Sequence, residues 1–191
     1  MNGLSKYYIK KLITCFAEEL TATETSKKLK VNRNTVNKYY RIVREAIAEY
    51  QTLQADMQVN IYGKQITPFY WHRSTGISLL NQPDSMAYQM AIVNKQVFVE
   101  ADLGKSTHVS NSDTAVATNL QNKSSDLSQS FFLYAKDKLT KFYGVKEQYT
   151  SLYLKELEFR FNNRERDITK LILRILPHHS TEWVKTNKYR K

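Results

Sequence analysis

Apolar residues at the start of the chain recur every three or four positions, which is the spacing of one face of an α-helix. The positions that share this face are Leu4, Tyr8, Leu12, Cys15, Phe16 and Leu20. A helix over this stretch would bury the apolar stripe, and the thiol of Cys15 would then be buried and unreactive. The pattern therefore predicts one amphipathic helix here.

The segment that follows predicts two more helices joined by a tight turn. Thr21 and Glu24 have the spacing of a capping box, in which the hydroxyl accepts a hydrogen bond from the N3 amide and the carboxylate accepts one from the cap amide. A short helix should start there and stop near Lys30, at a turn position where glycine is usual because positive φ is often needed. Asn32 is a good N-cap for a third helix over residues 33–50.

Two helices around such a corner are typical of a helix-turn-helix, with the small residue Ser26 where the helices need close packing. Val36, Tyr40 and Val43 would face the core of the unit. The polar residues of the third helix would then face outward: Arg33, Asn34, Thr35, Asn37, Lys38 and Arg41. Asn and Arg suit bidentate contacts with base edges in a major groove. We therefore predict a DNA-binding domain over residues 1–50; a plain three-helix unit with a solvated polar face is the alternative.

Short apolar and aromatic runs in the middle of the chain predict strands over residues 59–62, 66–71, 86–93 and 97–99. Asn94-Lys95 could make a two-residue hairpin turn between the last two. Residues 104–125 are rich in Ser, Thr and Asn with little apolar periodicity, and we expect a loop there. The expected fold class is α+β, with a small, mainly antiparallel sheet between helical ends.

The last third of the chain returns to helical spacing. One apolar face is formed by Phe131, Phe132, Ala135, Leu139 and Phe142. Lys136, Lys138 and Lys141 project elsewhere, so this helix should be basic and amphipathic, with Gly144 as its stop. Helical periodicity then continues from Leu152 almost to Pro177, with an interruption around residues 159–164 that has no simple amphipathic explanation.

The distribution of charge along the chain indicates a binding partner. The 191 residues include 29 Lys and Arg against 18 Asp and Glu, a formal net charge of +11. Residues 1–50 carry a net +5, residues 51–129 a net −1 and residues 130–191 a net +7. Two cationic ends around a neutral middle suggest two contacts with one polyanion. The alternative is that the positive charge only keeps the protein soluble. The partner expected is double-stranded DNA.

Other residue types exclude several classes of protein. One cysteine excludes a disulfide framework and a Cys-rich zinc site, and it indicates a reducing, cytosolic setting. The four histidines lack zinc-site spacing, and neither a Walker loop nor a nucleophile elbow occurs. The chain has no apolar run long enough to cross a membrane, so membrane spanning and export are not expected.

Candidate metal ligands are Asp102, Asp113 and Asp126, with Glu100 nearby. Two-metal phosphoryl transfer needs carboxylates that converge from separate elements. Each residue also has a structural alternative. Glu100 and Asp102 could be surface charges at a strand end, Asp113 lies in a turn-like run, and Asp126 could cap the helix that follows.

Three runs resemble bacterial insertion-sequence transposases of the ISXO-like group. Leu133–Val145 and Leu154–Arg164 are similar to the closing segments of that family, and Thr21–Ile47 is similar to its helix-turn-helix. The runs occur in the same order and cover roughly half of the sequence. Where the family has its first strand aspartate, residues 59–63 carry no acid.

This resemblance implies a reduced RNase H-like domain over residues 51–191 and Mg²⁺-dependent cutting and joining of DNA ends. In this enzymatic interpretation, Asp102, Asp113 and Asp126 hold the metal and Lys136 lies near the scissile phosphate. The basic helix adds the expectation that Lys138 and Lys141 bind DNA. A regulator of transposase descent that binds DNA without cutting is the alternative. The expected setting is the cytoplasm of a bacterium, at the nucleoid, and a homo-oligomer is left open.

Overall fold

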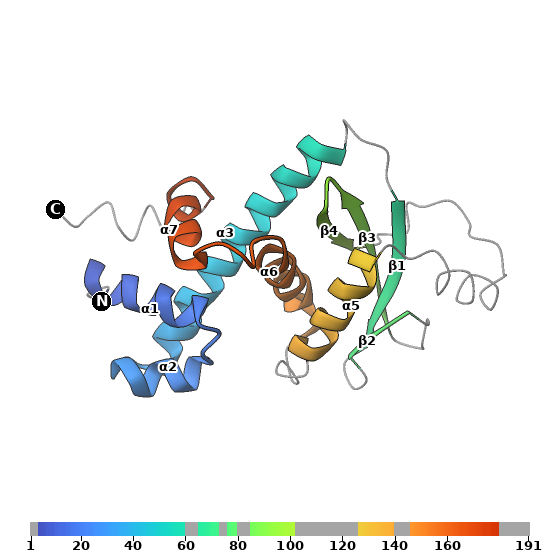
Figure 1. Cartoon of the computed structure of the whole chain (residues 1–191). Coiled ribbons are helices and arrows are strands. Elements are labelled where there is room, and N and C mark those ends of the chain that lie inside the picture. The colour runs from blue at the N-terminus through green and yellow to red at the C-terminus, as the bar shows by residue number, and fades with distance from the viewer. Residues whose placement is uncertain are drawn as a thin grey trace. The chain divides into compact units, whose positions relative to one another are not determined.

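The computed structural model describes residues 4–59, 65–72, 76–79, 85–101, 126–139 and 146–179. Within these ranges it is α+β, with six α-helices and a four-stranded antiparallel sheet (Figure 1). The helices are α1 (Lys6–Ala17), α2 (Ala22–Leu29), α3 (Arg33–Val59), α5 (Asp126–Leu139), α6 (Thr150–Asn162) and α7 (Ile168–His179), with the 3₁₀ turn η2 (Glu147–Tyr149) before α6. The strands are β1 (Gln65–His72), β2 (Gly76–Ser78), β3 (Met86–Val93) and β4 (Gln96–Ala101). None of the described helices is long and apolar enough to cross a membrane.

The chain forms two compact units. Met1–Leu53 and Asn163–Lys191 make up one, which we call the helical unit, and Gln54–Asn162 make up the other, the sheet unit. The helical unit holds α1, α2, α7 and most of α3, whereas the sheet unit holds the last residues of α3, the strands, α5 and α6. The functional division expected at residue 50 stays a prediction.

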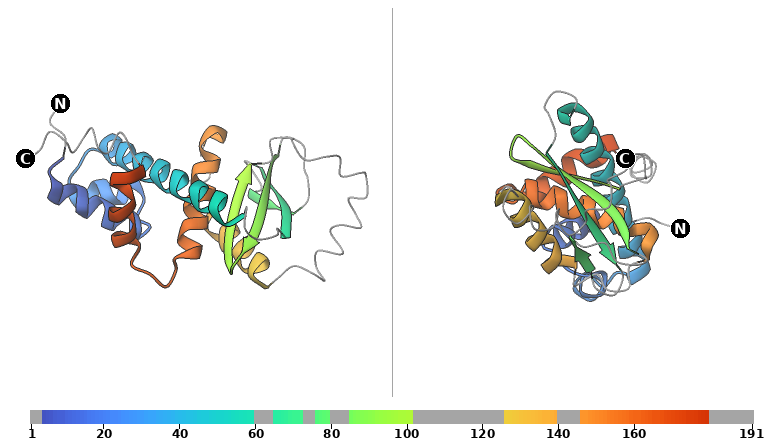
Figure 2. Two further views of the ribbon diagram at one scale, coloured as in Figure 1. Left: turned by 90° about the horizontal axis from the view of Figure 1, so that it is seen from above. Right: turned by 90° about the vertical axis from the view of Figure 1, so that its right-hand side faces the viewer.

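Helix α1 confirms the first predicted helix but with a different buried face. Its buried residues are Ile9, Leu12, Ile13, Cys15 and Phe16. Tyr8, which the sequence pattern placed in the apolar stripe, is 42% exposed. The buried face is completed by the β-branched residues Ile9 and Ile13, one position further along the helix, and it packs against α7 (Figure 2). Cys15 is buried, as predicted.

Helix α3 starts where it was expected to but ends later. It begins at Arg33, as predicted, and continues to Val59 instead of stopping near Tyr50. The strand predicted over residues 59–62 is therefore wrong at Val59, and its other residues lie outside the described ranges. No glycine or proline occurs between residues 51 and 59 to end the helix. Within the sheet unit, Ala55 packs with Val93 and Phe98, so the late turns of α3 are held by tertiary contact.

The sheet has the strand order β2-β1-β3-β4, and every pair of described strands is antiparallel. Strands β1, β3 and β4 confirm three of the predicted runs, whereas the three-residue strand β2 was not predicted. The predicted hairpin turn is also confirmed. Asn94 and Lys95 have φ of 50° and 61°, the two positive values that a type I′ turn requires. The RNase H-like assignment stays a proposal.

One face of the sheet forms the core of the sheet unit. Alternate residues point toward it, and the stacked rings of Phe69 and Tyr88, direct partners across β1 and β3, lie 5.5 Å apart. Helices α5 and α6 cover this face with Phe131, Ala135 and Leu154, which are all buried. The predicted apolar face of α5 is thereby confirmed at its described positions.

Helix α6 also contacts the outer edge of the sheet. The Glu158 carboxylate accepts a hydrogen bond from the Val99 amide at 2.9 Å. The Asn162 side chain makes two bonds with Val97, accepting from its amide at 2.9 Å and donating to its carbonyl at 2.7 Å. Two polar side chains of the helix therefore satisfy backbone groups of β4 that would otherwise lack a strand partner.

The helical periodicity was expected to break around residues 159–164, but the observed break lies further along the chain. Phe159, Arg160 and Phe161 are buried residues of α6, and the break between helices falls at residues 163–167. Glu156 and Arg160, one turn apart, form a buried ion pair at 2.8 Å. Because α6 is buried on most sides and carries paired charges inside, its sequence shows no one-sided apolar stripe.

Candidate nucleic-acid interface

The corner between α2 and α3 is built by local hydrogen bonds that the sequence encodes. At the start of α2, the Thr21 amide donates to Glu24 Oε2 at 2.7 Å, and the Glu24 amide donates to Thr21 Oγ1 at 3.2 Å. This is the predicted capping box, and it is confirmed. It fixes the residue at which α2 begins.

The turn at the end of α2 has left-handed backbone. Lys30 has φ of 53° and ψ of 40°, so this position does require the positive φ for which glycine is the usual residue. Ser26 holds the turn from inside, because its hydroxyl donates to the Val31 carbonyl at 2.7 Å and its carbonyl accepts from the Val31 amide at 3.2 Å. Asn32 then accepts from the Asn34 amide at 2.8 Å as α3 begins.

Tyr40 connects this corner to the core of the helical unit. Its ring meets Phe16 edge to face at 5.0 Å, and its hydroxyl donates to the Leu20 carbonyl at 3.0 Å. The Thr25 hydroxyl lies 2.7 Å from the same oxygen. The Arg44 guanidinium lies over both rings, 5.3 Å from the centroid of Phe16 and 5.8 Å from that of Tyr40. These contacts fix α3 against α1 and α2.

The opposite side of α3 carries polar residues, as predicted. The exposed members of the predicted set are Arg33, Asn34, Asn37, Lys38 and Arg41, which we call the α3 polar face. Thr35 is half-buried, and the predicted core residues Val36, Tyr40 and Val43 are buried. Asn34, Asn37, Lys38 and Arg41 follow the spacing i, i+3, i+4, i+7 and so form one stripe. This stripe offers amide and guanidinium groups to a ligand.

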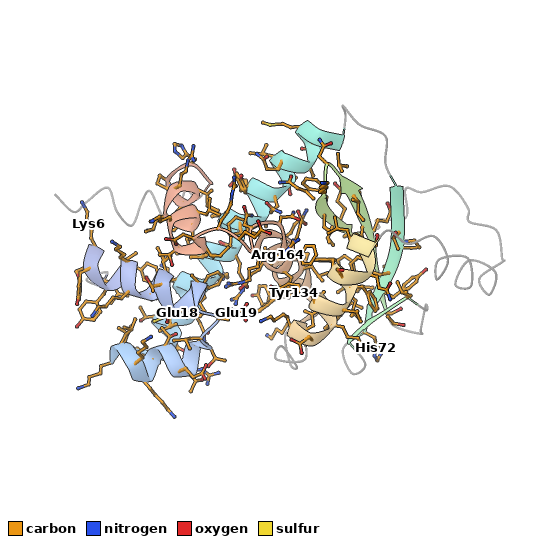
Figure 3. The ribbon with its side chains drawn as sticks, in the orientation of Figure 1. Lys6, Glu18, Glu19, His72, Tyr134 and Arg164 are labelled. Atoms are coloured by element: carbon orange, nitrogen blue, oxygen red, sulfur yellow. The ribbon has the colours of Figure 1, made fainter. Side chains whose placement is uncertain are left out.

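Charges around the corner are partly paired at the surface. Arg41 Nε lies 3.2 Å from Glu45 Oε1, and Lys28 Nζ lies 3.0 Å from Glu18 Oε2. The hydrogen bond to Glu18 raises the pKa of Lys28 above its usual value. Figure 3 shows Glu18 and Glu19 at the end of α1 that leads into α2. Surface pairs of this kind are weak and can be exchanged for a phosphate.

Positive charge is concentrated in the helical unit. Its described residues include 14 Lys and Arg against 7 Asp and Glu, whereas those of the sheet unit include 6 against 7. Part of the surplus comes from Arg164, Arg166, Lys170 and Arg174, in and before α7. In the described part of the chain, the cationic surplus from both ends of the sequence therefore belongs to one unit. A strongly positive surface suits a polyanion.

Most of the predicted metal ligands lie outside the described ranges, so their convergence stays a prediction. Asp102, Asp113 and Lys141 lie outside the described ranges. Asp126 is the first residue of α5, and only its backbone is described. Lys136 is exposed on α5. No group of three His, Cys, Asp or Glu side chains that could hold a metal occurs among the residues that the structure describes.

Two candidates on sheet-unit elements have defined positions. Glu100 is exposed near the end of β4, which fits a surface charge at a strand end. Lys138 on α5 is half-buried, with its ammonium 5.8 Å from the centroid of the Tyr134 ring. Both residues belong to the sheet unit, so neither is part of the α3 polar face.

The sequence reasoning missed a second exposed group in the helical unit. Tyr7 and Tyr8 both face solvent on α1, beside Lys6, Lys10 and Lys11. The signal was present in the sequence as two adjacent aromatic residues among lysines, but helical spacing assigned Tyr8 to the core. The α3 polar face thus remains the predicted interface that the described geometry fits best.

No protein-family model, curated protein or solved structure matches the chain.

Proposed function

We propose that this protein binds double-stranded DNA with the α3 polar face in the major groove. The observation that carries the proposal is the two-sided construction of α3. On one side Val36, Tyr40 and Val43 are buried, and on the other Asn34, Asn37 and Arg41 point outward in one stripe. Such a helix can present base-reading groups at a fixed angle because its back is anchored.

The dimensions and chemistry of the stripe fit a groove. Asn34 and Arg41 are seven residues apart, a rise of about 10 Å, and the major groove is about 12 Å wide. Asn can bond adenine at two atoms and Arg can bond guanine at two atoms, whereas Lys38 can meet a phosphate. Arg41 would exchange its ion pair with Glu45 for a bond to DNA.

The biological role follows from the resemblance to insertion-sequence transposases. We infer that the DNA bound is an insertion-sequence end, in the cytoplasm of a bacterium, and that Mg²⁺-dependent cutting and joining occurs there if the acids form a site. The second candidate is a regulator that occupies such DNA without cutting. The lack of an acid in residues 59–63 favours the regulator, whereas the closing runs Leu133–Val145 and Leu154–Arg164 favour the enzyme.

Equilibrium binding of the full chain to labelled duplexes tests the DNA proposal. If about six phosphates are neutralised, log affinity should fall with log salt at a slope near −5. Arg33→Ala or Asn37→Ala should narrow the affinity gap between a selected and a scrambled duplex by about 1–3 kcal/mol. Lys138→Ala should weaken both duplexes about equally, and Gln129→Ala, an exposed change on α5, should alter neither. A slope near zero, or equal behaviour of all four variants, would contradict the proposal.

Metal-dependent chemistry separates the two roles. A labelled duplex end incubated with the protein and Mg²⁺ or Mn²⁺ should be nicked or joined if the protein is an enzyme, and Asp126→Ala should abolish the product while duplex affinity stays the same. If no metal-dependent product forms under any condition, the protein is the regulator.

A further inference from the structure

The amino-terminal half of α1 presents a cationic and aromatic surface outside the α3 polar face. It consists of Lys6, Tyr7, Tyr8, Lys10 and Lys11, all exposed, and we call it the α1 tyrosine–lysine face. Tyr7 is 62% exposed, more than any other large hydrophobic side chain among the described residues. Helix packing does not require these rings, because Ile9, Leu12, Ile13 and Phe16 supply the buried side of α1.

The electrostatics of this face favour an anion. In the described part of the chain, no carboxylate pairs with Lys6, Lys10 or Lys11, and the first turn of α1 contains no acidic residue. The acidic residues of this region, Glu18 and Glu19, follow the opposite end of the helix (Figure 3). The positive end of the helix dipole therefore adds to the field of three lysines.

The two tyrosine rings give the face a second property. They meet edge to face with centroids 5.7 Å apart and planes at 85° to each other, and Lys11 Nζ lies 4.4 Å from the centroid of Tyr7. Rings at right angles present π-faces in two directions, beside cations that can follow a backbone. Exposed aromatic rings that alternate with basic residues are the chemistry by which proteins bind single-stranded nucleic acid.

We propose that the α1 tyrosine–lysine face binds unpaired DNA, with bases stacked on Tyr7 and Tyr8 and phosphates near the lysines. Lys6 and Lys10 are four residues apart on α1, a rise of about 6 Å, which suits neighbouring phosphates of one strand. The inference rests on the proposed function in one respect, that the partner is DNA. The residues that carry it are different, so duplex and single-strand binding can fail separately.

Binding of the full chain to a labelled oligothymidine tests this site. Tyr7→Ala with Tyr8→Ala should weaken single-strand affinity about tenfold or more, because stacking contributes about 1–3 kcal/mol per base and 1.4 kcal/mol is tenfold. Duplex affinity should stay within about twofold. The matched control is Tyr7→Phe with Tyr8→Phe, which keeps the rings and should keep single-strand affinity within about twofold. Far-ultraviolet circular dichroism checks that each variant is folded.

The lysines have a test of their own. Lys6→Ala with Lys10→Ala should reduce the salt slope of single-strand binding by about 1.4, because each phosphate that is no longer neutralised removes about 0.7 from the slope. Lys146→Ala removes a lysine charge from an exposed position of the sheet unit and should leave the slope unchanged.

Several results would overturn the inference. The first is that the wild-type protein binds duplex DNA but no single strand. The second is that the Ala substitutions at Tyr7 and Tyr8 leave single-strand affinity unchanged. The third is that the Phe variants lose as much single-strand affinity as the Ala variants. Competition with a glutamate-rich peptide is a further check. If this peptide displaces the labelled oligothymidine with the same efficiency as unlabelled oligothymidine, the inference is overturned in favour of polyanion binding without base stacking. Binding to the single strand but to no duplex would instead overturn the proposed function and leave this site in place.

Discussion

The hydroxyl group of Tyr40 donates a hydrogen bond to the carbonyl oxygen of Leu20 over 3.0 Å. Leu20 lies between α1 and α2, and Tyr40 lies on α3, so one phenol joins the three helices of the corner. Because the phenol proton is directed to Leu20, the Thr25 hydroxyl at 2.7 Å must be the donor in the second bond. The angle at which α3 presents its polar face thus depends on a buried polar contact.

Tyr40→Phe should lower the free energy of unfolding by about 1–2 kcal/mol, because one buried and one partly buried hydrogen bond are removed and their partners stay in place. Urea unfolding followed by circular dichroism measures this. Tyr39→Phe is the control, since Tyr39 is also buried but its hydroxyl makes no hydrogen bond to another residue in the described ranges. A change in the free energy of unfolding below about 0.5 kcal/mol is expected. If both variants lose the same free energy of unfolding, the hydrogen bonds of the Tyr40 hydroxyl do not stabilise the fold.

Lys30→Gly should make the protein more stable by about 0.5–1 kcal/mol. Left-handed backbone costs a residue with a Cβ about 1–2 kcal/mol, and glycine avoids that cost while adding a smaller entropy to the unfolded chain. The φ of 53° at Lys30 is the basis of this prediction. The same change inside α2, Lys27→Gly, removes the same charge and should instead destabilise by about 1 kcal/mol. If both variants lose stability, the turn does not store this strain in solution.

Asp167 gives stability a defined pH dependence. Its carboxylate accepts from the Lys170 amide at 3.0 Å at the start of α7, and this bond is the main reason that the pKa of Asp167 lies below its usual value. A folded pKa below the unfolded value of about 3.9 means that the ionised group stabilises the fold above that pH. This contribution is lost as the pH falls through the folded pKa.

Asp167→Asn removes this titration and keeps a capping side chain. Urea midpoints of the two proteins should therefore differ at neutral pH, with wild type higher, and should converge as the pH falls below about 4. The other carboxylates titrate in both proteins, so the difference isolates Asp167. A difference that does not change with pH would contradict the assignment.

Glu158 and Lys155 form a buried ion pair whose disruption should destabilise the sheet unit. Lys155 Nζ lies 3.0 Å from Glu158 Oε2 as an ion pair rather than a directed hydrogen bond, and their side chains are 12% and 0% exposed. Glu158→Gln should cost about 3 kcal/mol because a cation is left buried without its partner. Adding Lys155→Met should restore at least about 1 kcal/mol of this loss.

The matched control for this pair is an exposed one. Lys170 and Asp167 lie 3.4 Å apart, with the Lys170 side chain 84% exposed. Lys170→Met should change the free energy of unfolding by less than about 0.5 kcal/mol. If the Glu158 and Lys155 variants lose stability independently of each other, the buried pair is not coupled.

Much of the fold followed from local signals in the sequence. The capping box of α2, the start of α3 and the turn at Asn94-Lys95 depend on residues near one another in the chain, and all three predictions are confirmed. The end of α3 and the course of α6 depend on distant contacts. Ala55 packs on Phe98, and Asn162 bonds Val97, and no local pattern encodes either contact. The three-residue strand β2 is too short to produce a period.

The candidate site was predictable to a different degree at each of its parts. The outward residues of α3 could be read from helical spacing, because their buried neighbours Val36, Tyr40 and Val43 fix the opposite side. The exposure of Tyr7 and Tyr8 was indicated only by the lysines beside them, and helical spacing pointed the other way for Tyr8, because tyrosine occurs both in cores and at surfaces. Convergence of Asp102, Asp113 and Asp126 is a three-dimensional property that spacing does not contain, and it stays a prediction.

The bonds from Glu158 and Asn162 to β4 have a consequence for self-association. An uncovered outer strand can recruit a strand from another chain, which leads to swapped dimers or fibrils. Here Val97 and Val99 already have side-chain partners, so this border of the sheet is closed to such recruitment. An assembly of several copies would therefore have to form through surfaces other than the β4 border.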